Sequence, residues 1–139
     1  MTERITHNDR LLALIIRRDD TMPGVNFLTD DDSVMQVGIL NHPKSKVLQA
    51  HIHQEAERRI TGTQEVLFLR KGKLRVDFYA DDETYLESRT LEAGDTILLI
   101  SGGHGFEMLE DVDMIEAKTG PYVGDRDKRR FQPKRRPAK

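Results

Sequence analysis

The chain has 139 residues, of which 37% are apolar and 33% are charged, with a net charge of −2 and no cysteine. This length predicts one domain with a single core, and the lack of cysteine excludes disulfides, thiolate metal sites and a cysteine nucleophile. No apolar run approaches the roughly 18 residues of a membrane-spanning helix, and the first residues lack the pattern of a secretory signal. We therefore expect a soluble, cytoplasmic protein that does not bind membranes.

Short apolar stretches separated by turn residues run along the chain, which is the pattern of an all-β protein. We expect strands over residues 11–16, 25–28, 33–40, 47–53, 65–70, 73–79, 85–91, 96–100, 106–109 and 112–118. Two short turns, Lys71-Gly72 and Glu110-Asp111, are expected to close hairpins. The only plausible helix is a short polar one, Gln54–Arg59. About ten strands at this spacing predict an antiparallel sandwich or small barrel.

The stretch Lys73–Tyr79 shows the pattern of a half-buried strand most clearly. Leu74, Val76 and Phe78 alternate with Arg75, Asp77 and Tyr79. Because successive side chains of a strand point to opposite faces, we expect the three apolar residues to face the core.

Basic residues are concentrated at the C-terminal end. Residues 125–139 hold eight Lys or Arg and two Asp, which leaves 14 basic and 22 acidic residues in 1–124, a net charge of −8. We therefore divide the chain into a β-barrel domain over 1–124 and a basic tail over 125–139. Such a tail could contact nucleic acid, a membrane surface or another protomer, but its one aromatic residue, Phe131, offers little base stacking. We expect a solvated, partly disordered end and no nucleic-acid contact outside it.

Metal-binding side chains recur along the expected strands. His51 and His53 are two apart in an extended stretch, so both rings would point to one face. Glu65 opens the next strand, and His104 follows a later one after Ser101-Gly102-Gly103. Three imidazoles and one carboxylate converging from neighbouring strands would bind a divalent transition metal and leave coordination positions free for chemistry. We therefore predict a metal site formed by His51, His53, Glu65 and His104.

The other face of the same stretch indicates an oligomer. Leu48, Ala50 and Ile52 would point away from the histidine face and need a cover. A second subunit or the N-terminal segment could supply this cover, and a twofold dimer is the most common closed assembly. We therefore expect a homodimer.

These segments resemble the two sequence motifs of the cupin superfamily. His51-Ile52-His53 is similar to the start of the first motif, and Glu65–Gly72, with six residues between the carboxylate and the glycine, is similar to its end. Gly94-Asp95, five further residues and then Ser101–His104 are similar to the second motif. The resemblance covers residues 47–109, and it implies an antiparallel double-stranded β-helix, or jelly-roll barrel, as a single domain.

One departure from the motif leaves two carboxylates as candidate ligands. The eleven residues Gln54–Gln64 separate His53 from Glu65, many more than in the usual motif, and Glu57 stands at the usual spacing. Either carboxylate could therefore join the histidines. We favour Glu65 because it keeps the register with Gly72.

The resemblance implies a metal-dependent site for a small polar metabolite. The metal would be iron, manganese, zinc, nickel or cobalt in an octahedral site with two open positions, and the low aromatic content of 6% favours a sugar or organic acid as substrate. Catalytic residues are expected among Glu65, Glu107, Glu116 and Arg58, as proton-transfer groups or, for the arginine, as a ligand for an anionic substrate. We expect isomerase, epimerase or oxygenase chemistry. The alternative is a non-catalytic module that binds a metal or a small ligand.

Overall fold

The structure is a computed structural model that describes residues 1–133, and its regular elements there are ten strands and one short 3-10 helix. The predicted all-β class is thus confirmed. The chain divides into two compact units, residues 21–62 and residues 1–20 with the chain from 63 onward. We call them the small unit and the sandwich unit. Among the described residues, no helix has the length and apolar character needed to cross a membrane.

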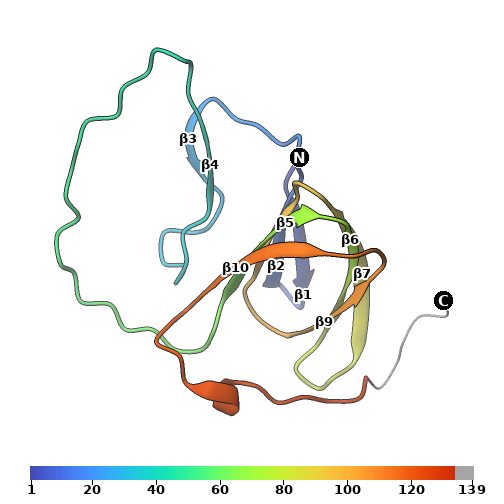
Figure 1. Cartoon of the computed structure of the whole chain (residues 1–139). Helices are drawn as coiled ribbons and strands as arrows, with labels where there is room; N and C mark the ends of the chain where they lie inside the picture. Colours follow the sequence, from blue (N-terminus) through green and yellow to red (C-terminus); the bar gives the residue numbers. More distant parts are fainter. Residues whose placement is uncertain (134–139) are drawn as a thin grey trace. The chain divides into compact units, whose positions relative to one another are not determined.

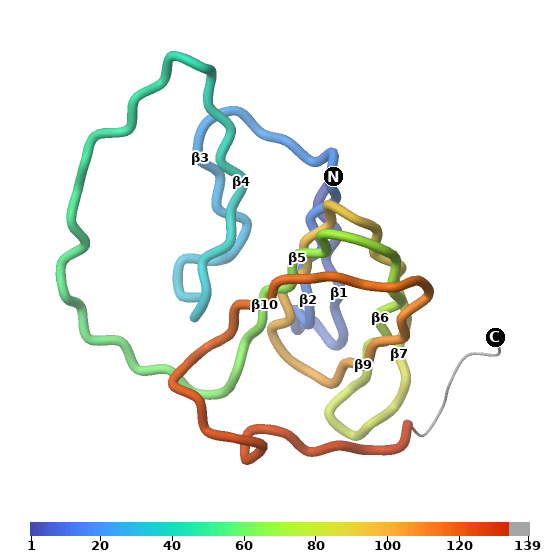
Figure 2. Tube along the Cα trace, in the orientation of Figure 1, coloured from blue at the N-terminus to red at the C-terminus, as the bar shows by residue number. Residues whose placement is uncertain are grey.

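Two antiparallel sheets build the sandwich unit (Figures 1 and 2). The first contains, in spatial order, β1 (Glu3–His7), β2 (Arg10–Ile16), β8 (Thr96–Leu99), β5 (Glu65–Lys71) and β10 (Asp113–Lys118). The second contains β7 (Tyr85–Glu92), β6 (Lys73–Tyr79) and β9 (Gly103–Met108). After β10, a single 3-10 turn, η1 (Gly124–Asp127), follows within the described part of the chain.

Apolar side chains of both sheets meet in one core. Leu74, Val76 and Phe78 of β6 are buried there, as the alternation predicted. The five-stranded sheet contributes Ile5, Leu12, Ala13, Ile15, Leu67, Leu69, Ile97 and Leu99. Burial of this shared apolar surface is the main stabilising contribution, and it makes the two sheets a β-sandwich.

Most of the expected strands are present with ends shifted by a few residues, although the stretch expected over 33–40 is a strand only over Gly38–Asn41. The strand that the sequence did not reveal is β1, Glu3-Arg4-Ile5-Thr6-His7. Its only apolar residue is Ile5, so a search for apolar stretches passes over it. Pairing with β2 forms the strand and buries Ile5.

The two turns expected to close hairpins instead carry the chain from one sheet to the other. Lys71-Gly72 joins β5 to β6, and Glu110-Asp111 joins β9 to β10, and neither pair of strands is hydrogen-bonded. The hairpin prediction was therefore wrong. Gly72 has a φ of +89°, and a Cβ there would overlap the carbonyl oxygen of Asp111. The two corners thus pack on each other, which the local sequence of either one does not specify.

The small unit contains a two-stranded antiparallel ladder, β3 (Gly24–Phe27) with β4 (Gly38–Asn41). The strand expected over 47–53 and the helix expected over 54–59 are both absent, so these predictions were wrong. A strand needs a neighbour for its backbone N–H and C=O groups, and no described backbone group pairs with residues 47–53.

The apolar residues of this stretch are exposed, Val47 at 83% and Ile52 at 87%. The apolar strand face from which we expected a homodimer is therefore not formed as a strand face. The homodimer itself stays a prediction.

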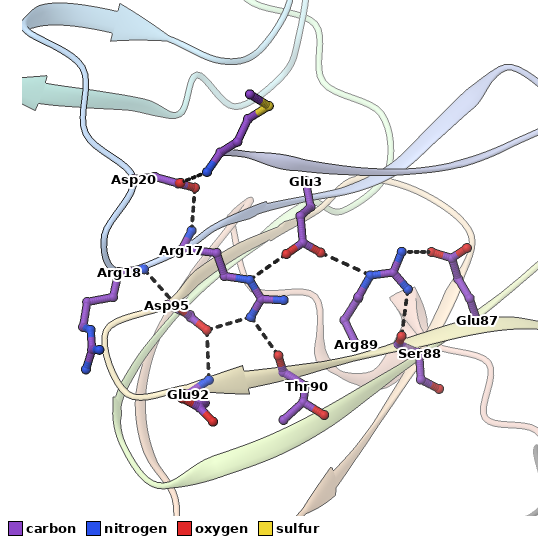
Figure 3. Close-up of polar contacts among 11 residues, drawn as sticks. Glu3, Arg17, Arg18, Asp20, Glu87, Ser88, Arg89, Thr90, Glu92 and Asp95 are labelled. Carbon is purple, nitrogen blue, oxygen red and sulfur yellow. Dashed lines mark hydrogen bonds and ion pairs between the residues drawn. The ribbon is translucent and has the colours of Figure 1, made fainter.

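A polar cluster occupies the end of the sandwich unit where β2 ends and β8 begins (Figure 3). The carboxylate of Asp95 accepts hydrogen bonds from Nη1 of Arg17 at 2.8 Å and from the backbone N–H groups of Arg18 and Glu92, each at 2.9 Å. Glu3 accepts a hydrogen bond from Nε of Arg17 at 2.7 Å. We call these five residues the Asp95 cluster.

Candidate functional site

Glu65 and His104 lie in the sandwich unit at the opposite end of β8 from the Asp95 cluster. Glu65 is the first residue of β5 and pairs with Leu99, the last residue of β8. His104 lies on β9 of the other sheet, where it pairs with Phe78. The predicted carboxylate and one predicted histidine are thus brought together from two sheets.

The two side chains are in direct polar contact. Nε2 of His104 lies 3.4 Å from Oε2 of Glu65, and the side chains are 31% and 13% exposed. The pairing with His104 lowers the pKa of the Glu65 carboxyl, and this outweighs burial, which raises it. The positive charges of His104, Lys118 and Lys128 lower this pKa further. Glu65 is therefore held as a carboxylate beside an imidazole that water can reach.

A cavity of about 700 Å³ surrounds this pair. Its walls include apolar side chains of both sheets, Tyr79, Leu99, Ile100 and Phe106, and the glycine-containing run that flanks His104. A volume of this size suits a small metabolite. The cavity combines apolar side chains with the His104–Glu65 pair and with charged residues of the C-terminal segment, which is a composition that suits a ligand-binding site.

The C-terminal segment, residues 127–133, forms another wall of this cavity. The ring of Phe131 packs edge-on against Tyr79, with ring centroids 5.2 Å apart. It also fills the space beside Gly103, because a Cβ on that glycine would lie 3.1 Å from the ring. This segment is held on the sandwich by its one aromatic side chain.

Polar contacts fix the same segment. The hydroxyl of Thr63 donates a hydrogen bond to the carboxylate of Asp127 at 3.1 Å, and Arg129 forms an ion pair with Glu83. The sequence predicted a solvated end here, and Asp127–Arg130 and Gln132 are exposed, whereas Phe131 and Pro133 are half-buried; the rest of the predicted tail, 134–139, lies outside the described residues. An isolated aromatic residue in a basic stretch was the signal that could have revealed the contact.

His51 and His53 belong to the small unit. Their ring centroids lie 5.1 Å apart, and Nδ1 of His51 lies 3.0 Å from the carbonyl oxygen of Gln49. Both side chains are exposed on an irregular backbone, as are Glu57 and Arg58. In the described part of the chain, no group of three or more His, Cys, Asp or Glu residues could hold a metal. The four-ligand site therefore stays a prediction.

The two other carboxylates expected to act in catalysis lie outside the walls of the cavity. Glu107 forms an ion pair with Arg75 at 2.7 Å. It is three residues from His104 on β9, so the two side chains point to opposite faces of the strand. Glu116 is exposed on β10, opposite Leu67 in the ladder. Their catalytic roles stay predictions.

No family model matches the chain, and no curated protein or solved structure matches it either. The resemblance to cupins rests on the sequence motifs, and the chemistry proposed below rests on the cavity and its residues.

Proposed function

We propose that the sandwich unit binds a small polar metabolite, a sugar or an organic acid, and moves a proton on it as an isomerase or epimerase does. The observation that carries this proposal is the contact of His104 with Glu65 inside a cavity of about 700 Å³. An imidazole beside a carboxylate is a common proton-transfer pair in enzymes.

Each residue of the pair has its own role in this proposal. The imidazole of His104 takes a proton from a carbon next to a carbonyl group and returns it, since histidine changes its charge near neutral pH. The carboxylate of Glu65 orients the ring and stabilises the positive charge that forms on it. The lowered pKa of Glu65 suits this role, because the residue stays ionised at neutral pH.

We further propose that the sandwich has the jelly-roll arrangement of a cupin. Two antiparallel sheets share one core, and the chain changes sheet at Gly72 and again at Asp111. Such sheet-changing connections support a jelly roll over a stack of simple hairpins.

A metal-dependent form of this activity is the second candidate. His104 and Glu65 are close enough to bind one ion, given ligand bonds of about 2.0–2.2 Å. The predicted set also includes His51 and His53 of the small unit, whose ring centroids lie 5.1 Å apart. A divalent transition metal would polarise a carbonyl oxygen of the substrate or, as iron, support oxygenation. The sandwich unit supplies two of these donors, whereas catalytic zinc sites use about three protein ligands.

Proton exchange with solvent tests the proposal directly. We would incubate the protein with a panel of aldoses, ketoses and 2-oxo acids in D₂O and follow deuterium entry at carbon by NMR. His104→Gln is expected to reduce the rate by about 100-fold or more, while His7→Gln, a histidine on β1, is the matched control. Binding that shifts the His104 ring signals without any exchange would favour the non-catalytic module, and no shift with any member of the panel would refute the site.

Elemental analysis separates the two candidates. Protein purified without chelator is compared with a His51→Ala/His53→Ala variant. Near-stoichiometric metal that is lost in the variant would support the metal-dependent form, whereas proton exchange that persists in a chelator would support the His104–Glu65 pair alone.

A further inference from the structure

The charged residues on the cavity walls are of both signs, and most of them already have partners. Glu65 is paired with His104, and Asp127 accepts a hydrogen bond from Thr63. Among the basic residues of the C-terminal wall, Arg129 pairs with Glu83, and Arg130 lies 3.4 Å from a carboxylate oxygen of Asp125. Carboxylates thus pair with both arginines, while Asp127 has a neutral hydroxyl as its partner.

Lys128 differs from its neighbours in this wall. It lines the cavity, and in the described part of the chain no carboxylate lies within ion-pair distance of its ammonium group. Its backbone N–H donates to the carbonyl oxygen of Asp125 at 3.1 Å, which fixes the main chain where the 3-10 turn ends. Its charge acts on Glu65 from a distance and helps to lower the pKa of that carboxyl, but its ammonium group has no direct ion-pair partner in the described part of the chain.

The packing of Phe131 holds the backbone that carries Lys128. The ring of Phe131, three residues further along, lies against Tyr79 and above Gly103. A wall that is already ordered does not lose further conformational freedom when a ligand binds, so its contacts contribute more fully to affinity. Lys128 is thus carried by a preformed surface.

From this arrangement we propose that the cavity takes a small organic anion and that Lys128 recognises its carboxylate or phosphate group. The inference rests on the proposed function and narrows its ligand to the anionic class. The apolar walls formed by Leu99, Ile100 and Phe106 accommodate the carbon skeleton, while His104 reaches the reacting end. A neutral sugar would leave the ammonium group of Lys128 without a direct ion-pair partner.

Ligand titrations followed through the His104 ring signals test this assignment. The probes are succinate, glycerol 3-phosphate and the neutral polyol erythritol, at a constant ionic strength of about 0.15 M because screening weakens such contacts. We expect one or both anions to bind and erythritol not to bind. Comparing the two anions shows whether the site prefers a carboxylate or a phosphate.

Variants of Lys128 then test whether this residue binds the anionic group of the ligand. Lys128→Met is expected to weaken anion binding by about fivefold, the size of one exposed charge pair, and Lys128→Arg is expected to retain it. Arg126→Met is the matched control, because Arg126 lies two residues before Lys128 but does not line the cavity, and its Nε donates to the carbonyl oxygen of Val123. Unfolding midpoints in urea confirm that each variant is folded.

The outcomes distinguish the inference from the function on which it rests. Anion binding that is equal in wild type and Lys128→Met, or erythritol binding as tight as succinate binding, would overturn the role of Lys128 and leave the His104–Glu65 site standing. If no probe or panel compound moves the His104 signals, both proposals fail together.

Discussion

The two polar clusters at the ends of β8 use similar residues in opposite ways. At one end, the Asp95 side chain is 6% exposed and accepts hydrogen bonds from Arg17 and from two backbone N–H groups. At the other end, Glu65 has one close side-chain partner, His104, and an adjoining cavity. A carboxylate that accepts several hydrogen bonds from its own chain stabilises the fold. A carboxylate with one partner and an adjoining cavity can also contact a bound ligand.

Electrostatics follow the same division. Burial would lower the pKa of Arg17, but its hydrogen bonds to Glu3 and Asp95 outweigh this and raise it. The guanidinium of Arg17 also donates to the carbonyl oxygen of Thr90 at 2.8 Å, which ties β2 to β7 of the other sheet (Figure 3). The Asp95 cluster thus joins the two sheets, and its loss is expected to affect stability more than any change at the cavity.

The largest expected effect is that of Asp95→Ala. The substitution leaves Arg17 and two backbone N–H groups without their acceptor, so the free energy of unfolding should fall by about 3 kcal/mol. Urea denaturation measures the change. Asp113→Ala is the matched control, because the ion pair of Asp113 with Arg70 is half exposed on both sides and should contribute less than about 1 kcal/mol. Equal losses in the two variants would contradict the structural role of the Asp95 cluster.

The next effect concerns the wall of the cavity. In Gly103→Ala the new methyl group meets Phe131 and Tyr79 at 3.1 Å, so we expect a loss of about 1–3 kcal/mol or displacement of the Phe131 ring. Lys128 and Arg129 are already exposed, and displacement of the ring would free the backbone around them, so trypsin should then cut there faster. Gly105→Ala is the control on the same face of β9, since its nearest contact is at 3.7 Å. If both variants resist trypsin and unfold alike, the packing of Phe131 contributes nothing.

The smallest expected effect is that of Glu65→Gln, and it depends on pH. Because the folded-state pKa of Glu65 lies below its ordinary value of 4.5, its ionised form stabilises the fold above that value, and the contribution is lost as the pH falls through the lowered pKa. We expect wild type to exceed the variant by about 1 kcal/mol near pH 6 and to match it in strong acid.

A double-mutant cycle assigns this difference to the pair. Once His104 is replaced by Gln, the further change Glu65→Gln should cost less than it does in the wild type, because its partner is gone. An unchanged cost, measured by urea denaturation near pH 6, would show that Glu65 acts on stability through other neighbours.

The candidate site was predicted only in part. The motif register placed Glu65 at the start of a strand and His104 after a later one, and the structure brings these two side chains together. Phe131 was a signal for a contact within residues 127–133, but the residues that it contacts could not be predicted from the sequence, because a basic stretch is ordered only where its neighbours provide partners. Tyr79 and Gly103, far away in sequence, provide them here.

The sequence by itself determined that an alternating stretch such as Lys73–Tyr79 becomes a strand with Leu74, Val76 and Phe78 in the core, because successive side chains point to opposite faces. The burial of Asp77 and Tyr79 on the other face is not predicted by the alternation. Only the tertiary structure decided which strands pair. The turn at Gly72 could close a hairpin or connect two sheets. In the structure it connects β5 to β6 of the other sheet, and this corner packs on Asp111. Val47–His53 has the composition of a strand and is not one, because a strand exists only where a neighbour satisfies its backbone.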